Sequence, residues 1–213
     1  MYSRHVVVVE NEPLMRDLIG KTLEGAGFKV TTAANAADAK RVHLAIDPDA
    51  MVIDIELGPG PDGFDLAASV IAESPEISIV FLTNLPDPRL VGKDSKSIPK
   101  NSAYLRKSNL VDANELIDAL NSVLKNEDAS AYRHDLDSRR PLADLSSKQL
   151  EVLKQIAEGL SNQQIADARG TSVRAVEGII SRVFDALNID VQDEGNSRVD
   201  AVKKYFLATR PGE

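Results

Sequence analysis

Apolar residues along the first 125 positions follow two periodicities, one typical of buried strands and one typical of helices. Short continuous apolar runs predict strands that are covered on both faces, over residues 6–9, 28–32, 49–57, 77–83 and 103–106. Between these runs, apolar residues recur at helical spacing and predict helices over residues 13–23, 36–46, 64–72 and 112–124. Five strands that alternate with helices predict an α/β fold with a doubly wound parallel sheet.

The alternation weakens between the fourth and fifth strands. Residues 84–101 contain three prolines, one glycine and three lysines, with little apolar periodicity. A helix here would continue the alternation of strands and helices, but proline and glycine are poor residues for a helix interior. This stretch is therefore predicted to form little regular helix.

Residues 127–141 carry mixed charges and few apolar residues, and they are predicted to be an exposed linker between two domains.

The chain that follows this linker has only helical patterns. Ser146 with Gln149, and Ser161 with Gln164, have the spacing of capping boxes, and an apolar stripe follows each pair. A short helix, a turn with Gly170 and a longer helix from residue 172 predict a helix-turn-helix. The predicted domains are 1–126 and 142–213, joined by 127–141. In the last helix, Val199, Val202, Tyr205 and Phe206 are expected on one side.

Composition narrows the class of protein. The 213 residues are 43% hydrophobic and 27% charged, which is ordinary for a globular protein, and they include no cysteine, which excludes disulfides and thiolate metal sites. No apolar run is long enough for a membrane span, and the first strand follows Met1 too closely for a signal peptide. A cytoplasmic protein is expected. The net charge of −8 argues mildly against a protein that coats nucleic acid, but the acidic excess lies before residue 127.

Polar side chains with complementary chemistry follow four of the predicted strands. Glu10 and Asn11 come after the first strand, Asp54 lies in the third, and Thr83 and Lys107 end the fourth and fifth. A buried carboxylate such as Asp54 is costly unless it has a partner or a function. The carboxyl ends of parallel strands form the ligand-binding edge of open α/β sheets. The residues alone leave open a purely structural ion pair between Asp54 and Lys107.

Residues 3–125 resemble the receiver domain of two-component response regulators, through Glu10-Asn11-Glu12-Pro13, Asp54, Thr83, Tyr104 and Lys107. The resemblance implies a flavodoxin-like fold in which Asp54 accepts a phosphoryl group from a sensor histidine kinase. It also implies Mg²⁺ at Glu10, Asn11, Asp54 and Glu56, a Lys107 ammonium on the phosphoryl group, and Thr83 and Tyr104 as switch residues. The family usually has two acidic residues where this chain has Glu10 and Asn11. We therefore expect a weakened Mg²⁺ site and slow phosphorylation.

The sequences 145–153, 157–166 and 172–177 resemble the LuxR-type helix-turn-helix, and 198–205 resembles its closing helix. Together the two resemblances indicate the NarL/FixJ class of response regulators, which implies binding to double-stranded DNA and a homodimer. The residues expected to face DNA are Gln163, Thr171, Ser172, Arg174, Glu177, Gly178, Ser181 and Arg182. Arg174 and Arg182 are expected to contact phosphate or guanine, although a solvated surface is the alternative because each has an acidic residue within one turn.

The sequence supports one main hypothesis and three alternatives. The main hypothesis is a DNA-binding transcriptional regulator that is controlled by phosphorylation of Asp54. The second is an atypical receiver that is controlled by a ligand or a protein partner and still binds DNA. The third is a protein-interaction adaptor that no longer binds DNA. The fourth is an enzyme, which is not expected because the sequence shows no chemistry beyond self-modification of the receiver.

Overall fold

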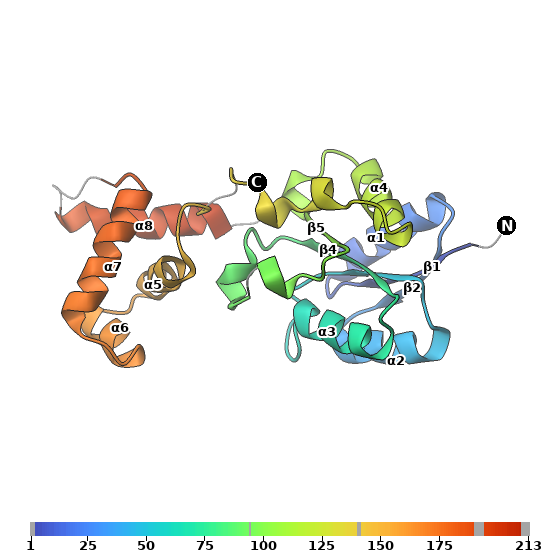
Figure 1. The fold of residues 1–213 in the computed structure, drawn as a ribbon, viewed down its shortest axis with the longest axis horizontal. Coiled ribbons are helices and arrows are strands. Elements are labelled where there is room, and N and C mark those ends of the chain that lie inside the picture. Colours follow the sequence, from blue (N-terminus) through green and yellow to red (C-terminus); the bar gives the residue numbers. More distant parts are fainter. Residues whose placement is uncertain (1–2, 94, 140–141, 190–193, 210–213) are drawn as a thin grey trace. The chain divides into compact units, whose positions relative to one another are not determined.

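The structure, a computed structural model, describes residues 3–93, 95–139, 142–189 and 194–209 (Figure 1). The chain forms two compact units, which are described separately below. One unit contains Met1–Leu85 and Ser95–Asp135, and the other contains Pro86–Asp94 and Leu136–Glu213. This division crosses the boundaries predicted from the sequence at residues 86–94 and 127–135, and residues 140–141 of the predicted linker lie outside the described residues.

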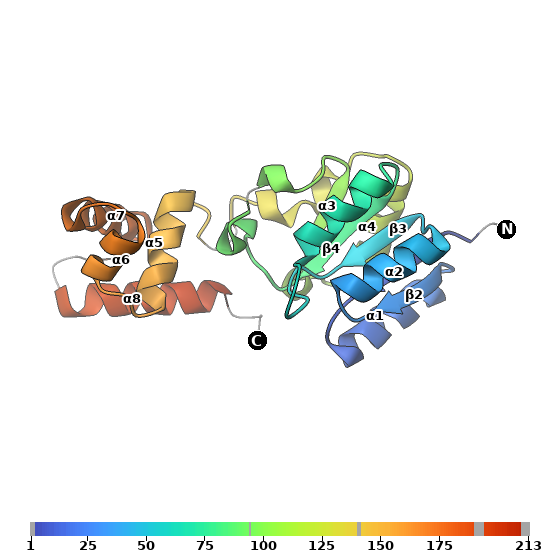
Figure 2. The same ribbon diagram turned by 90° about the horizontal axis from the view of Figure 1, so that it is seen from below.

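The first unit is a five-stranded parallel sheet between two layers of helices. Its strands are β1 (His5–Val9), β2 (Lys29–Ala33), β3 (Ala50–Ile53), β4 (Ser78–Thr83) and β5 (Ser102–Arg106). They are arranged in the order β2-β1-β3-β4-β5. The helices α1 (Pro13–Gly25) and α4 (Ala113–Leu124) cover one face, and α2 (Ala36–Ile46) and α3 (Gly63–Glu73) cover the other (Figures 1 and 2). The predicted doubly wound α/β fold is confirmed.

Burial on both faces explains the continuous apolar runs of the central strands. Alternate residues such as Val6, Val8 and Val52 join α1 and α4 in one core, together with Leu23 and Leu120. The intervening strand residues point to the opposite face, and they are also fully buried. Both sheet faces are therefore dry, and polar residues collect at the ends of the strands.

One segment of the first unit differs from the sequence expectation. The predicted linker is partly buried, because Ala129 and Asp135 are shielded from solvent and Arg133 forms a parallel bridge with Tyr104 of β5. It contains the 3-10 turns η4 (Ser130–Tyr132) and η5 (His134–Leu136). In α4, the Asp112 side chain caps the helix by accepting from Asn114 N, and Glu115 contacts His134.

The helices of the second unit are α5 (Ser147–Ala157), α6 (Asn162–Ala168), α7 (Val173–Ala186) and α8 (Glu194–Thr209). Both predicted capping boxes are present, at Ser146 with Gln149 and at Ser161 with Gln164. Gly170 adopts a φ of +59° in the turn between α6 and α7, which is a conformation that glycine accepts without strain. The helix-turn-helix prediction is confirmed in its geometry.

Helix α8 buries mainly small side chains. Val199 and Phe206 are 48% and 46% exposed, whereas Ser197, Ala201 and Ala208 are buried. Small residues allow α8 to pack closely, and they leave the larger apolar side chains at the surface.

Between β4 and β5, the described residues form only the 3-10 turns η1 (Pro88–Val91) and η2 (Ser95–Ser97), as the weak helical pattern predicts. No helix among the described residues has the length and apolar character to cross a membrane.

Candidate functional site

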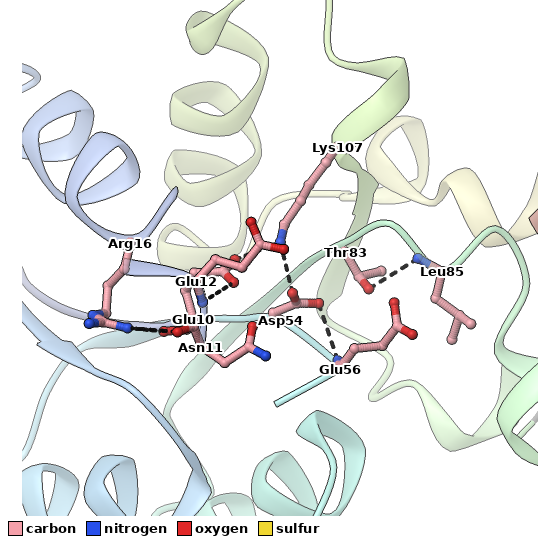
Figure 3. A network of polar contacts seen from close by, with 9 residues as sticks. All are labelled: Glu10, Asn11, Glu12, Arg16, Asp54, Glu56, Thr83, Leu85 and Lys107. Carbon is pink, nitrogen blue, oxygen red and sulfur yellow. Dashed lines mark hydrogen bonds and ion pairs between the residues drawn. The ribbon is translucent and has the colours of Figure 1, made fainter. Parts of the chain in front are cut away.

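The polar residues predicted at the strand ends meet at one edge of the sheet (Figure 3). Glu10 follows β1 and Asp54 follows β3, and these strands are hydrogen-bonded neighbours. The Asp54 backbone N–H donates to Val9 O at 2.9 Å and continues the ladder to this edge. The sequence order reverses here, because β2 lies on the far side of β1 from β3, and such a reversal is where open sheets bind ligands.

Lys107 joins the two carboxylates. Its Nζ lies 2.5 Å from Glu10 Oε2 and 2.7 Å from Asp54 Oδ2. Glu10 is 1% exposed and Asp54 is 6% exposed, so both ion pairs are shielded from water. Burial alone would lower the pKa of Lys107, but the Asp54 and Glu10 carboxylates outweigh it and raise this pKa above its ordinary value of 10.5. The site therefore holds one firmly charged ammonium against two acidic groups.

The other oxygens of these carboxylates are held by backbone amides. Glu12 N donates to Glu10 Oε1 at 3.1 Å, and Glu56 N donates to Asp54 Oδ1 at 3.3 Å. These bonds orient each carboxylate without neutralising it. The Asp54 carboxylate is consequently fixed at the end of its strand, with one oxygen on the loop amide and the other on Lys107 (Figure 3).

The remaining residues of the predicted metal set lie at the rim. Asn11 and Glu56 are both exposed. Partial burial and the Asp54 carboxylate raise the pKa of Glu56, and Lys107 acts in the opposite direction. Arg16 Nη1 donates to the backbone oxygens of Glu10 and Asn11, at 2.6 and 3.2 Å, and fixes this turn. Within the described residues, no group of three or more His, Cys, Asp or Glu side chains is placed to hold a metal ion.

Gly63 allows the N-terminus of α3 to lie directly against the Asp54 loop. A Cβ at this position would stand 2.3 Å from Asp54 O and 2.8 Å from Ile55 Cα, which is closer than atoms can approach. Gly63 N also donates to Ile55 O at 3.0 Å. The strand and helix patterns of the sequence did not single out Gly63 as a residue of this site.

Thr83 and Tyr104, the predicted switch residues, both bond to the backbone of Leu85. Leu85 N donates to Thr83 Oγ1 at 3.2 Å, and Tyr104 Oη donates to Leu85 O at 2.8 Å. Both Thr83 and Tyr104 are completely buried, and Phe81 packs against the Tyr104 ring with the ring centroids 6.3 Å apart. The tyrosine is therefore turned into the protein, and Leu85 is fixed from both sides.

The second unit presents most of the predicted DNA-facing residues to solvent. All eight are exposed except Gly178, which is partly buried: Gln163, Thr171, Ser172, Arg174, Glu177, Gly178, Ser181 and Arg182. The opposite side of α7 is buried through Val176, Ile180 and Val183. Helix α7 thus has one apolar face toward its own core and one polar face toward solvent.

Two of these predicted contacts already have structural roles, and one basic residue was missed. The Ser172 side chain accepts from Ala175 N and caps α7, and Gln163 donates to Asp167 at 2.8 Å. A hollow beside α7 is lined by Arg174, Gly178, Ile179 and Arg182, and also by Ser146, Lys148 and Gln149 from the start of α5. Lys148 adds a third cation to this surface. Lys148 reaches this surface only because α5 packs against α7, which the sequence pattern does not show.

The comparisons with known proteins cover both units. Residues 6–128 match the family model described as the response regulator receiver domain, and residues 143–203 match the model described as bacterial regulatory proteins, luxR family. The chain is 30% identical to the oxygen regulatory protein NreC of Staphylococcus epidermidis over 178 residues, which are 78% of this chain and 81% of that protein. The N-terminal domain of a response regulator/sensory box/GGDEF three-domain protein from Carboxydothermus hydrogenoformans is 27% identical, with a TM-score of 0.50, and the match covers 58% of this chain and 95% of that one.

A likeness in fold extends over almost the whole chain. The response regulator RcsB, solved as a complex with DNA, superposes with a TM-score of 0.59 and 19% identity, and the match covers 95% of this chain and 99% of that one.

Proposed function

The chain belongs to the response regulators that combine a receiver domain with a LuxR-type DNA-binding domain, and from this premise we propose that phosphorylation of Asp54 controls its binding to DNA. The observation that carries the proposal is the position of the Asp54 carboxylate. It lies at the carboxyl edge of the sheet, bonded to the Lys107 ammonium, with the Thr83 hydroxyl at the end of the neighbouring strand. In this proposal residues 1–126 act as the receiver and residues 142–213 bind DNA.

The chemistry is a phosphoryl transfer to a carboxylate. An Asp54 oxygen forms a new P–O bond as the P–N bond of a phosphohistidine on a sensor histidine kinase breaks, and the bonding electron pair leaves with the imidazole. Lys107 already bonds to Asp54 and would pair with the phosphoryl oxygens, which carry the developing negative charge. The Thr83 hydroxyl would release Leu85 N and would donate a hydrogen bond to a phosphoryl oxygen.

The oxygen donors at this edge fit Mg²⁺ in kind. Magnesium prefers hard oxygen ligands and is usually anchored by one or two carboxylates. The buried Glu10 and Asp54 supply two carboxylates, Asn11 adds an amide oxygen, and Glu56 lies at the exposed rim. Bound there, Mg²⁺ would neutralise negative charge on the phosphoryl group. Neutral Asn11 contributes no charge, so we expect a weak metal site and slow phosphorylation.

The regulated activity would be the recognition of double-stranded DNA by α7. Arg174 and Arg182 are exposed on the polar face of this helix, beside Lys148 of α5. Acidic residues on the same face, such as Glu177, limit the affinity of one subunit, so a homodimer on a two-fold site is expected. A regulator of this kind would act in the cytoplasm and would catalyse no reaction on a separate substrate.

The test compares the wild type with Asp54→Asn and Asp112→Asn. Asn at residue 112 retains the N-cap of α4, so this variant is a matched control on the same edge of the sheet. After incubation with Mg²⁺ and acetyl phosphate, intact mass should show one added phosphoryl group in the wild type and in Asp112→Asn, but none in Asp54→Asn. Selection from random DNA, with and without beryllofluoride, should then recover a two-fold symmetric site whose affinity depends on the analogue.

A second candidate function is control by a small ligand or a protein partner without phosphorylation. Two observations favour it: Asn11 stands where the family usually has an acidic residue, and only 3-10 turns are present among the described residues between β4 and β5. DNA selection that succeeds while the wild type takes up neither phosphoryl group nor beryllofluoride would support this candidate over the first.

A further inference from the structure

Residues Pro86–Val91, here called the tether, come directly after the strand that contains Thr83, yet they form part of the DNA-binding unit. They cluster with Leu136–Glu213 and not with the sheet. The turn η1 within the tether packs against α5, and the side chains of Pro88 and Leu90 are buried. A piece of chain that belongs to the receiver by sequence is thus built into the second unit.

A buried ion pair fixes the tether to the residues before α5. Asp87 is 1% exposed; it accepts from Arg89 N at 3.0 Å and receives Arg89 Nε at 2.9 and 3.0 Å on its two oxygens. The Arg89 guanidinium also donates to the backbone oxygens of Leu145 and Leu142, the second at 3.1 Å. Leu145 immediately precedes the N-cap of α5, so Arg89 holds the point at which this helix begins.

Helix α5 also holds the tether from its own side. Lys154 Nζ donates to Leu90 O at 3.4 Å. The same helix packs against α7, which presents the predicted DNA-reading residues, and against α8. A movement of the tether therefore reaches α7 through a single packed helix.

At its other end the tether is joined covalently to Leu85. The backbone N–H of Leu85 donates to Thr83, and its backbone oxygen accepts from Tyr104. Proline at residues 86 and 88 restricts the backbone between Leu85 and Arg89, so a displacement of Leu85 is poorly absorbed by rotation of the chain.

We propose that the tether, anchored by Asp87 and Arg89, is the element that couples the state of Asp54 to the DNA-binding unit. This inference rests on the proposed function. When the Thr83 hydroxyl turns to a phosphoryl group it releases Leu85 N. The backbone of Leu85 then moves, and the tether carries this movement to the start of α5. Asp87 and Arg89 act as positioning residues, because they touch neither the phosphoryl group nor DNA.

The first experiment measures the DNA affinity of the full chain with and without beryllofluoride. Arg139→Gln is a matched control: Arg139 follows Asp137 at the same spacing and bonds to it in the same way, but its side chain is 89% exposed. We expect at least a fivefold change of affinity in the wild type and in Arg139→Gln. In Arg89→Gln the change should fall below about twofold, and Arg89→Lys should show the same loss because it keeps the charge but not the fork-shaped set of donors. A full response in Arg89→Gln would overturn the inference and leave the proposed function intact.

A second experiment decides the inference even if the wild type does not respond to beryllofluoride, which would count against the proposed function. Tyr104→Phe removes the hydrogen bond to Leu85 O without any phosphoryl group. We expect amide hydrogen exchange to become about fivefold faster in the tether and at the start of α5, which is the scale of one lost hydrogen bond. Tyr104→Phe in an Arg89→Gln background should leave amide exchange at the start of α5 unchanged. Unchanged exchange in α5 of Tyr104→Phe, or an equal increase in both backgrounds, would refute the coupling.

Discussion

Lys107 Nζ lies 2.7 Å from Asp54 Oδ2, and this ion pair closes the carboxyl edge of the sheet between the third and fifth strands. Because the same ammonium also bonds to Glu10, two buried carboxylates share one cation. The site therefore carries an excess negative charge before any phosphoryl group arrives. Its stability and its chemistry both depend on how that charge is compensated.

Replacing Lys107 with Met should lower the free energy of unfolding by about 3 kcal/mol at pH 7, because it leaves two buried carboxylates without their cation. The folded-state pKa of Lys107 is raised, so its contribution is complete below 10.5, the ordinary value, and is lost as the pH rises through the higher folded value. Urea denaturation between pH 7 and 11.5 should show the difference between wild type and variant shrinking only above pH 10.5. Lys21→Met, at an exposed pair with Asp17, is the control and should change little. A difference that shrinks below pH 9 would contradict the assignment.

Gly63→Ala should disturb the Asp54 loop, because the added Cβ would stand 2.3 Å from Asp54 O. The start of α3 must then shift, which should cost about 2 kcal/mol of stability and slow the phosphorylation of Asp54. Gly25→Ala at the end of α1 is the matched control, since nothing lies within 4 Å of its Cβ. Urea unfolding and phosphorylation rates check both variants. Equal behaviour of the two would show that the close approach is unimportant.

The sequence predicted those features whose cause is local. Continuous apolar runs identify strands that are covered on both faces, and capping boxes identify the starts of α5 and α6. The strand-end residues could be grouped because parallel strands share one carboxyl edge. The burial of Ser197 and Ala201 in α8 was not predicted, because small residues give no clear apolar pattern in the sequence.

Features that depend on distant partners were not predictable. The Asp87–Arg89 pair reads as two exposed charges in the sequence, and its burial depends on carbonyls more than fifty residues away. Lys148 joins the surface of α7 only through helix packing. The predicted linker looked polar, whereas its Arg133 and Asp135 satisfy each other at the edge of the sheet.

Arg133→Gln should detach part of that linker from β5. Asp135 is fully buried and receives Arg133 Nε at 2.7 Å, so the variant leaves a buried carboxylate without this cation. We expect a loss of about 3 kcal/mol in the free energy of unfolding. Amide exchange in β5 should become faster, because Arg133 bridges to Tyr104 there. Arg139→Gln, whose pair with Asp137 is exposed, should have little effect on either measurement. Unchanged exchange in β5 would show that the bridge does not protect the strand.

Charge changes on the exposed face of α7 should alter DNA binding in opposite directions. Arg182→Ala should weaken binding and reduce the slope of log affinity against log salt by about 1 if it contacts phosphate. Glu177→Gln removes a negative charge from the same face, and it should strengthen binding to random DNA. Binding titrations at several salt concentrations test both variants, with Arg41→Ala on α2 as the control. If Arg182→Ala changes neither affinity nor slope, Arg182 is only a solvated surface residue.

Asn11→Asp should convert the rim of the site into a stronger cation site. Asn11 is exposed beside Glu10, so an aspartate there adds a third carboxylate to a cluster in which Lys107 supplies the neighbouring cation. Without Mg²⁺ this extra charge should lower the melting temperature. With Mg²⁺ the variant should recover more stability than the wild type, since a ligand that binds only the folded state stabilises it.

The same substitution should accelerate phosphorylation of Asp54 by acetyl phosphate about tenfold, which corresponds to about 1.4 kcal/mol in the barrier. Asn109→Asp, an exposed change after β5, controls for net charge and should alter neither the Mg²⁺ dependence nor the rate. Acceleration without greater Mg²⁺ stabilisation would indicate that Asp at residue 11 acts through Lys107 and not through the metal. If neither quantity changes, Asn11 is not the reason for a weak site, and control of this receiver by another ligand becomes the better explanation.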